Sequence, residues 1–168
     1  EVVQVGTPEE ILTEPANDYV ERFVENVGRG RIITASSIMK TKPVVARLKK
    51  EGPEAIIRKM REKNLFVLPV VGTDGQFLGE VSLKDVVNLR KQGIKEIDSV
   101  VTSEVPSVLE STTVEDMLTL LPKIKQVIPV VSDSNKLLGV VSPSSIIIEM
   151  TGKDQKEINQ IIQNAIDL

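Results

Sequence analysis

The chain has 168 residues, of which 40% are hydrophobic and 27% are charged, and its formal net charge is -3. This length can bury one good core and is too short for more than one or two domains. Because the sequence contains neither cysteine nor histidine, it excludes thiol nucleophiles, imidazole acid-base catalysis, zinc sites and disulfides. Three Phe, one Tyr, no Trp and no basic excess also argue against a nucleic-acid partner.

The first thirty residues predict a strand and two helices. Residues 1–5 are rich in apolar side chains, and Thr7, Pro8 and Glu10 form a capping pattern that opens a short helix. The next helix begins at the cap Asn17 and carries an apolar stripe, interpreted as a packing face: Tyr19, Val20, Phe23, Val24 and Val27. No run is long enough to span a bilayer and no signal-peptide pattern occurs, and since the first residue is glutamate we expect a piece of a longer protein.

The rest of the chain is organised around a stretch that occurs twice. Residues 67–85 read VLPVVGTDGQFLGEVSLKD, and residues 127–145 read VIPVVSDSNKLLGVVSPSS. Each copy is a β-branched apolar run, a polar turn and a second apolar run, which is the pattern of a buried hairpin. We therefore expect two structural repeats, each with a helix after its hairpin.

The first repeat begins at Thr34. Its predicted elements are a helical turn (36–39), a strand (43–45), a helix opened by Gly52 and Pro53, two strands (66–71 and 77–81) joined through Asp74 and Gly75, and a helix (83–91). Ile56, Ile57 and Met60 face inward at helical spacing. Ser82 caps the second helix and Gly93 stops it.

The second repeat follows the same order. Its predicted elements are a strand (105–109), a helix capped by Thr112 or Thr113, two strands (126–131 and 137–141) and a helix capped by Ser142 with Pro143 at its first position. Met117, Leu120 and Leu121 are expected to face inward. Since one copy is too small to bury its own sheet well, we expect the two copies to pack sheet to sheet and share a core.

Residues 1–12 (EVVQVGTPEEIL) and 15–20 (PANDYV) resemble the closing strand and helices of an ABC transporter ATPase domain. The resemblance is to the subunits of glycine betaine, carnitine and choline importers in particular. The chain lacks the G-x-x-x-x-G-K-[ST] phosphate-binding motif, because its only Gly-Lys pair, Gly152-Lys153, is followed by Asp154. We therefore expect no enzymatic activity from this chain alone, although the resemblance implies a transport ATPase for the full-length subunit.

With its P-V-V and L-G-x-V-S motifs, the repeated unit resembles a tandem pair of CBS domains over roughly residues 34–150. The resemblance implies an α/β fold of two β-α-β-β-α units related by a pseudo-two-fold axis, with two clefts that commonly bind adenosine nucleotides. The expected segments are an ATPase tail and linker (1–30), a first CBS domain (31–93), a second CBS domain (94–152) and a C-terminal amphipathic helix (153–168). That last helix carries an apolar stripe: Ile158, Ile161, Ile162, Ala165 and Ile166.

In CBS pairs, a G-x-x-[ST]-x-x-D pattern admits a ligand at the glycine, places a hydroxyl and a helix N-terminus at phosphate, and offers the aspartate to ribose. The first repeat keeps all three residues as Gly79, Ser82 and Asp85, whereas the second has Ser145 in place of the aspartate. Ser82 and Asp85 equally form an ordinary helix cap. The predicted ligand-binding residues are Thr41, Val45, Val67, Gly79, Ser82, Asp85, Val127, Val140 and Ser142.

The resemblance implies an adenine nucleotide as the ligand and requires no cofactor. We expect ATP or AMP in the cleft of Ser82 and Asp85, with Val45 and Val67 beside the base. Cyclic di-AMP inhibits some of the resembling importers, and its two-fold symmetry suits an interface between paired CBS units. Its adenines would lie against Val45 and Val67 or against Val127 and Val140. Val127 and Pro143, however, stand where an aromatic ring or an arginine would hold a purine.

Charge is distributed unevenly between the repeats. Residues 40–63 carry nine basic and three acidic side chains, whereas residues 103–125 carry two basic and four acidic ones. The basic stretch predicts a solvated helix face or, alternatively, a patch for anionic lipid, phosphate or a protein partner.

These observations predict a regulatory module that senses a ligand or ionic strength and gates an osmoprotectant importer. The alternative is a purely structural module that dimerises the ATPase subunits without a ligand. The resemblance implies a homodimer through the CBS helices, the membrane subunits of the transporter as partners of the parent ATPase domain, and a place on the cytoplasmic face of the cell membrane. An anionic membrane surface is a further candidate partner.

Overall fold

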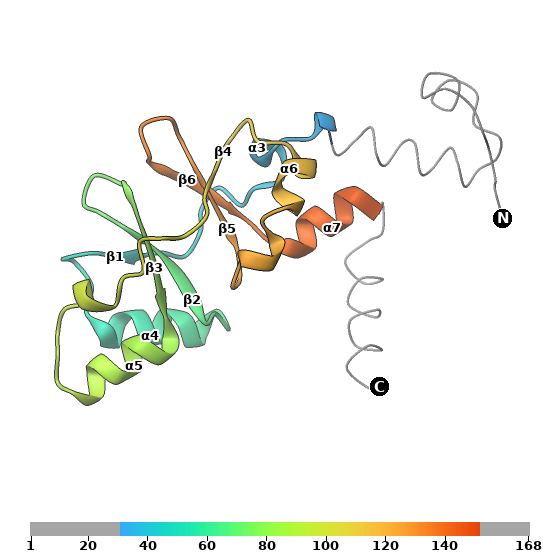
Figure 1. Cartoon of the computed structure of the whole chain (residues 1–168). Helices are drawn as coiled ribbons and strands as arrows, with labels where there is room; N and C mark the ends of the chain where they lie inside the picture. Colours follow the sequence, from blue (N-terminus) through green and yellow to red (C-terminus); the bar gives the residue numbers. More distant parts are fainter. Residues whose placement is uncertain (1–30, 152–168) are drawn as a thin grey trace, which may run out of the picture.

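The structure is a computed structural model that describes residues 31–151, so the elements predicted in residues 1–30 and 153–168 lie outside the described residues. It contains two three-stranded sheets, each covered by helices of its own repeat (Figure 1). The elements of the first half are α3 (Ala35–Ile38), β1 (Ala46–Arg47), α4 (Pro53–Glu62), β2 (Val67–Val71), β3 (Phe77–Ser82) and α5 (Leu83–Lys91). Those of the second half are η1 (Asp98–Val100), β4 (Val108–Leu109), α6 (Val114–Leu118), η2 (Leu121–Lys123), β5 (Ile128–Val131), β6 (Leu137–Val141) and α7 (Pro143–Thr151). The predicted α/β fold with two β-α-β-β-α units is confirmed.

The two sheets have the same topology and register. In each, the first strand pairs in parallel with the second, and the second pairs antiparallel with the third, giving the orders β1-β2-β3 and β4-β5-β6. Val70 pairs with Gly79 as Val130 pairs with Gly139, and both hairpins have a register shift at the following residue. Positions of the two hairpins can therefore be compared one by one.

The helix starts follow the predicted capping residues. Pro53 stands at the start of α4, and the Ser82 hydroxyl caps α5 by accepting a hydrogen bond from the Asp85 N–H at 3.2 Å. Of the two candidate threonines, Thr113 caps α6 through the Asp116 N–H at 3.2 Å. The α6 helix ends at Leu118, earlier than predicted, because Pro122 has no N–H to continue the helix and the chain tightens into η2.

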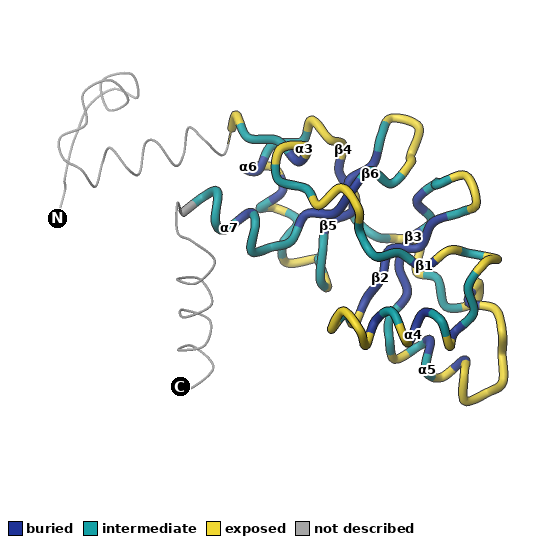
Figure 2. Tube along the Cα trace, turned by 180° about the vertical axis from the view of Figure 1, so that it is seen from behind, coloured by how far each residue is buried: buried dark blue, intermediate teal, exposed yellow. Residues whose placement is uncertain are grey.

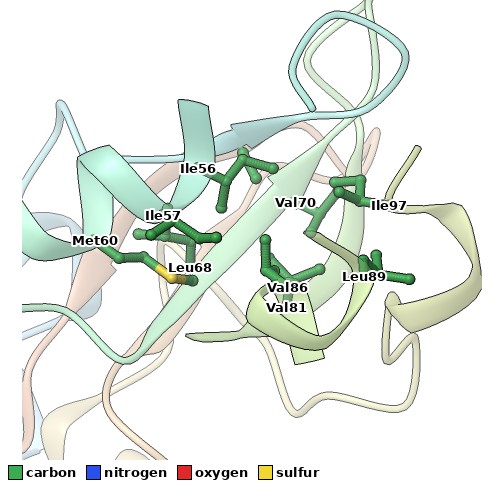
Figure 3. Close-up of a cluster of buried hydrophobic side chains, with 10 residues drawn as sticks. Ile56, Ile57, Met60, Leu68, Val70, Val81, Val86, Leu89 and Ile97 are labelled. Atoms are coloured by element: carbon green, nitrogen blue, oxygen red, sulfur yellow. The ribbon is translucent and has the colours of Figure 1, made fainter. Parts of the chain in front are cut away.

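Each repeat has its own hydrophobic core, so the expectation of one shared core is wrong. The first cluster, shown in Figure 3, lies where α4 and α5 cover β2 and β3, and consists of Ala46, Ile56, Ile57, Met60, Leu68, Val70, Val81, Val86, Leu89 and Ile97. The second consists of Ala35, Val108, Val114, Met117, Ile128, Val130, Val141 and Ile146. Leu120 and Leu121, predicted to face inward, are only partly buried against it. Two cores form because each sheet has its own pair of covering helices.

The segments that lead into the repeats cross over to the opposite repeat. Lys40 and Val140 exchange two backbone hydrogen bonds of 2.9 and 3.2 Å, and Thr102 and Glu80 exchange two of 2.9 and 3.0 Å. The crossing exchanges core residues as well, since Ala35 belongs to the second core and Ile97 to the first. Packing therefore crosses the boundary between the sequence segments 31–93 and 94–152.

The first strand of each sheet is shorter than predicted. The strand expected at residues 43–45 begins instead at Ala46, and the one expected at 105–109 is limited to Val108–Leu109. Pro43 has no N–H to donate to a neighbouring strand, which delays pairing in the first repeat. The hairpin strands are mostly buried along their length, whereas the turns between them are exposed (Figure 2). No helix among residues 31–151 is long and apolar enough to cross a membrane.

Candidate ligand clefts between the repeats

A cavity of about 290 Å³ lies between the repeats and is named here the Ser142 cleft. Its lining consists of Ile38, Lys40, Pro43, Val44, Leu65, Val67, Leu68, Pro69, Gln126, Val127, Val140, Ser142 and Ser145. Most of these side chains are apolar, and two of the four polar ones, Ser142 and Ser145, lie where β6 leads into α7. Apolar walls with a few convergent polar groups are typical of small-molecule sites.

The Ser142 cleft brings together four of the nine predicted ligand residues: Val67, Val127, Val140 and Ser142. Thr41, Val45, Gly79, Ser82 and Asp85 do not line it. Val44 lines the cleft in place of Val45, because neighbouring residues of an extended segment face opposite sides. The carbonyl of Val45 instead accepts a hydrogen bond from Lys59 Nζ at 3.0 Å.

The polar end of the Ser142 cleft is built from serine hydroxyls. Ser142 Oγ lies 2.8 Å from the hydroxyls of both Ser144 and Ser145 and accepts a hydrogen bond from the Ser145 N–H at 3.1 Å. Lys40 adds a cationic side chain to the lining. Hydroxyls, a helix N-terminus and an ammonium group are suited to a phosphate.

Gln126, Leu65 and Lys40 are lining residues that sequence reasoning missed. Gln126 Oε1 accepts hydrogen bonds from the N–H groups of Phe66 and Val67, at 3.1 and 3.0 Å. Its side chain thereby fixes the start of β2 against the second repeat. The sequence does contain a signal for the role of Gln126. It is a polar residue directly before the apolar run of β5, where the first repeat has Phe66.

On the Ser82 side lies a more open groove of about 660 Å³, named here the Ser82 groove. Its lining consists of Phe66, Val67, Ser82, Leu83, Lys84, Val87, Asn88, Lys91 and Lys125. Val67 thus lines both sites. Ser82 Oγ donates a hydrogen bond to Asp85 Oδ2 at 2.6 Å, so the two side chains satisfy each other as a helix cap.

Gly79 is explained by the crossing of the chain. Its φ is +131°, and a Cβ at this position would lie 2.1 Å from the carbonyl oxygen of Thr102. At Gly139 a Cβ would lie 2.8 Å from the carbonyl oxygen of Lys40. In both repeats the glycine therefore admits the backbone of the segment that crosses from the other repeat.

The basic stretch of residues 40–63 is partly neutralised within the fold. Lys49 Nζ lies 2.6 Å from Asp98, and Lys59 pairs with Glu51. The hydrogen bond from Lys49 lowers the pKa of Asp98. Burial acts to raise the pKa of Glu51, but the hydrogen bond from Lys59 and one from the Arg47 N–H outweigh it, so that the pKa is lowered.

Six other cations of this stretch form no ion pair with any described residue: Lys40, Lys42, Arg47, Lys50, Arg61 and Lys63. They are exposed to solvent. The basic stretch therefore contains two groups of lysines and arginines. The ion-paired group holds parts of the fold together, and the unpaired group remains available to a partner.

The family model of the CBS domain matches residues 35–91 and 94–152. Together with the doubled β-α-β-β-α unit and the clefts between the repeats, this match shows that the chain belongs to the CBS domain family. The predicted tandem pair is thereby confirmed.

Two curated relatives of this chain are transport ATP-binding proteins. The glycine betaine/carnitine transport ATP-binding protein GbuA of Listeria monocytogenes is 32% identical over 154 residues, which are 91% of this chain and 38% of GbuA. The choline transport ATP-binding protein OpuBA of Bacillus subtilis is 32% identical over 156 residues, which are 88% of this chain and 40% of OpuBA. The chain thus spans about two fifths of the length of these relatives.

Solved structures of CBS pairs share the fold. CBSX2 in complex with AMP has a TM-score of 0.58 at 22% identity, covering 68% of this chain and 93% of CBSX2. The CBS pair of MJ0100, in complex with 5'-methylthioadenosine and S-adenosyl-L-methionine, has a TM-score of 0.58 at 21% identity, covering 73% of this chain and 98% of that one. Staphylococcus aureus OpuCA has a TM-score of 0.56 at 20% identity, covering 64% of this chain and 91% of its own.

Proposed function

We propose that this chain is a regulatory, adenine-nucleotide-binding module of the ATP-binding subunit of an osmoprotectant importer. The observation that carries the proposal is the Ser142 cleft, in which apolar walls from both repeats lead to the serine hydroxyls at the start of α7. Two CBS pairs of the same fold are complexes with AMP and with adenosine derivatives, and the curated relatives are importer ATP-binding proteins. A ligand that contacts both repeats stabilises the arrangement of the repeats that binds it best, and can regulate the protein in this way.

The chemistry of the two sites favours different adenine nucleotides. The Ser142 cleft offers an adenine the walls of Val67, Val127 and Val140, and a phosphate the serine hydroxyls and Lys40. It has no carboxylate for a ribose diol, because Ser145 replaces the aspartate. Cyclic di-AMP has no free ribose diol, since its 3' oxygens are esterified, so the missing carboxylate does not disfavour it here. Asp85 does not line the Ser82 groove, but its carboxylate accepts a hydrogen bond from the lining residue Ser82, and we propose AMP or ATP for this groove.

Calorimetric titration of the chain with AMP, ATP and cyclic di-AMP tests this assignment. Val127→Glu places a charge in the Ser142 cleft and is expected to abolish cyclic di-AMP binding, while Asp85→Ala is expected to weaken AMP or ATP binding. Thr113→Ala removes a helix cap outside both lining sets and serves as the control. If the folded wild-type chain binds none of the three nucleotides, the proposal of a nucleotide-binding module is wrong.

A structural module that dimerises the ATPase subunits is the second candidate. The mutual hydrogen bonds of Ser82 and Asp85 favour it, because they account for both residues without a ligand. We propose that the chain forms a homodimer through its CBS helices in either case. Light scattering at high micromolar concentration is expected to give the mass of a dimer, and the mass of a monomer would contradict it.

A further inference from the structure

The internal repeat lets the two sites be compared position by position. The pairing of Val70 with Gly79 matches that of Val130 with Gly139, and the bridge of Thr102 with Glu80 matches that of Lys40 with Val140. Four residues of the Ser142 cleft therefore have known counterparts on the Ser82 side. Leu65, Gln126, Val140 and Ser145 correspond to Lys125, Phe66, Glu80 and Asp85.

The most unusual of these differences is the one between Val140 and its counterpart Glu80. Glu80 is only 4% exposed, and among the described residues it is the single charged residue in the buried set. Its carboxyl forms no hydrogen bond or ion pair with any residue in 31–151. A largely buried carboxyl without a partner is costly, and native proteins rarely retain one without a reason.

The orientation of β3 sets the direction of the Glu80 side chain. Val81 points into the first core, so that its neighbours Glu80 and Ser82 lie on the opposite side of the strand, towards the second repeat. The counterpart Val140 lines the Ser142 cleft. No buried side-chain oxygen in the described residues lacks a partner, so the small accessible part of Glu80 includes its carboxyl oxygens.

The residues around the Ser82 groove match the other parts of an adenine nucleotide. Phe66 lines the groove, is 68% exposed, and offers a flat apolar surface to a base. Lys84, Lys91 and Lys125 line the same groove and can pair with phosphates. Glu80 is not itself a lining residue, but it lies two residues before the lining residue Ser82 on the same side of β3, which places it beside the groove.

We propose that Glu80 is a specificity residue of the Ser82 groove, where its carboxyl accepts a hydrogen bond from the exocyclic amino group of an adenine. The inference rests on the proposed function and adds to it the part of the base that is recognised. A base with a carbonyl oxygen at the same position, such as hypoxanthine, offers no donor there and turns a lone pair towards the carboxyl. AMP is therefore distinguished from IMP.

The test is the ratio of the affinities for AMP and IMP, measured by calorimetry on the whole chain. A hydrogen bond to a charged group contributes about 1.5 to 3 kcal/mol, so we expect wild type to prefer AMP by about tenfold to a hundredfold. Glu80→Val introduces the residue found at position 140 and is expected to bring the ratio close to one. Glu80→Gln keeps an acceptor oxygen and is expected to retain part of the preference.

Glu62→Val is the matched control, because it removes an exposed carboxylate from α4 outside both sites and is expected to leave the ratio unchanged. Thermal melting of each variant verifies that it is folded. Equal affinities for AMP and IMP in wild type, or an unchanged ratio in folded Glu80→Val, would overturn the assignment of Glu80 while leaving nucleotide binding itself intact. Failure of every nucleotide to bind would instead contradict the proposed function.

Discussion

At the scale of single residues, Glu80 links the stability of the fold to pH. Burial is the main cause that raises the pKa of its carboxyl, and the positive charge of Lys125 opposes it. A raised pKa means that the folded state favours the protonated form. The resulting stabilisation is fully present below the unfolded pKa and is lost as the pH rises through the folded pKa.

We therefore expect Glu80→Val to stabilise the chain at neutral pH, where the buried carboxyl is most costly. A fully buried unsatisfied polar group costs about 1 to 3 kcal/mol. Because the carboxyl oxygens of Glu80 keep slight access to solvent, we expect an increase in the free energy of unfolding near the lower end of this range. Urea denaturation at pH 7 and at pH 4 measures it, and the increase should be smaller at pH 4. An equal gain at both pH values would show that ionisation of Glu80 is not the cause.

A substitution at Gly79 tests the close contact between β3 and the segment of Thr102 that crosses from the second repeat. Because a Cβ at Gly79 would lie 2.1 Å from a backbone oxygen, Gly79→Ala requires the crossing segment to move. Forced strain of this kind costs about 1 to 3 kcal/mol, and we expect a loss of unfolding free energy at or above this range. Gly139→Ala, where the nearest oxygen would be at 2.8 Å, is the milder comparison. Equal losses in urea denaturation would contradict this explanation.

At the scale of secondary-structure elements, the caps of α5 and α6 form a matched pair. Ser82 bonds to Asp85 as Thr113 bonds to Asp116, with side-chain contacts of 2.6 and 2.8 Å. Ser82→Ala and Thr113→Ala are each expected to lower the free energy of unfolding by about 1 kcal/mol, because each leaves a helix N–H without its acceptor. Only Ser82→Ala is expected to weaken AMP binding. Equal effects on binding would show that Ser82→Ala acts through the stability of the fold and not through a contact with the ligand.

Sequence reasoning succeeded where structure depends on neighbouring residues. The hairpin strands, Pro53 at the start of α4 and the cap Ser82 follow from local propensity, so they were predictable within a residue or two. The backbone pairing of Lys40 and Thr102 with the opposite repeats was not predictable, because it joins segments that are far apart in the chain. The roles of Gln126 and Glu80 were missed for the same reason, since each is defined by contacts with, or burial against, the other repeat.

At the scale of the whole molecule, the division of the basic stretch predicts two kinds of variant. Replacing the unpaired Lys50, Arg61 and Lys63 by glutamine is expected to weaken binding to anionic vesicles, since a basic residue near such a surface contributes about 1 kcal/mol. Cosedimentation with vesicles measures this, and binding should fall as salt rises because the screening length is about 8 Å at physiological ionic strength.

Replacing the ion-paired Lys49 and Lys59 by glutamine provides the comparison. Lys49 joins the turn after β1 to the segment between the repeats, and Lys59 holds the carbonyl of Val45. These changes are expected to lower thermal stability with a smaller effect on vesicle binding. If both sets of variants bind vesicles as wild type does, the basic stretch is a solvated surface.

The crossing of Lys40 and Thr102 has a consequence for how the two sites came to differ. In a single repeat produced alone, the segment that leads into the repeat would have no strand of another repeat to pair with. Two separate copies can each supply that strand to the other, and so form a symmetric dimer that resembles the pair. In such a dimer every substitution would appear in both sites at once. Fusion of two copies into one polypeptide removes this constraint, so that one site can carry a glutamate where its twin carries a valine.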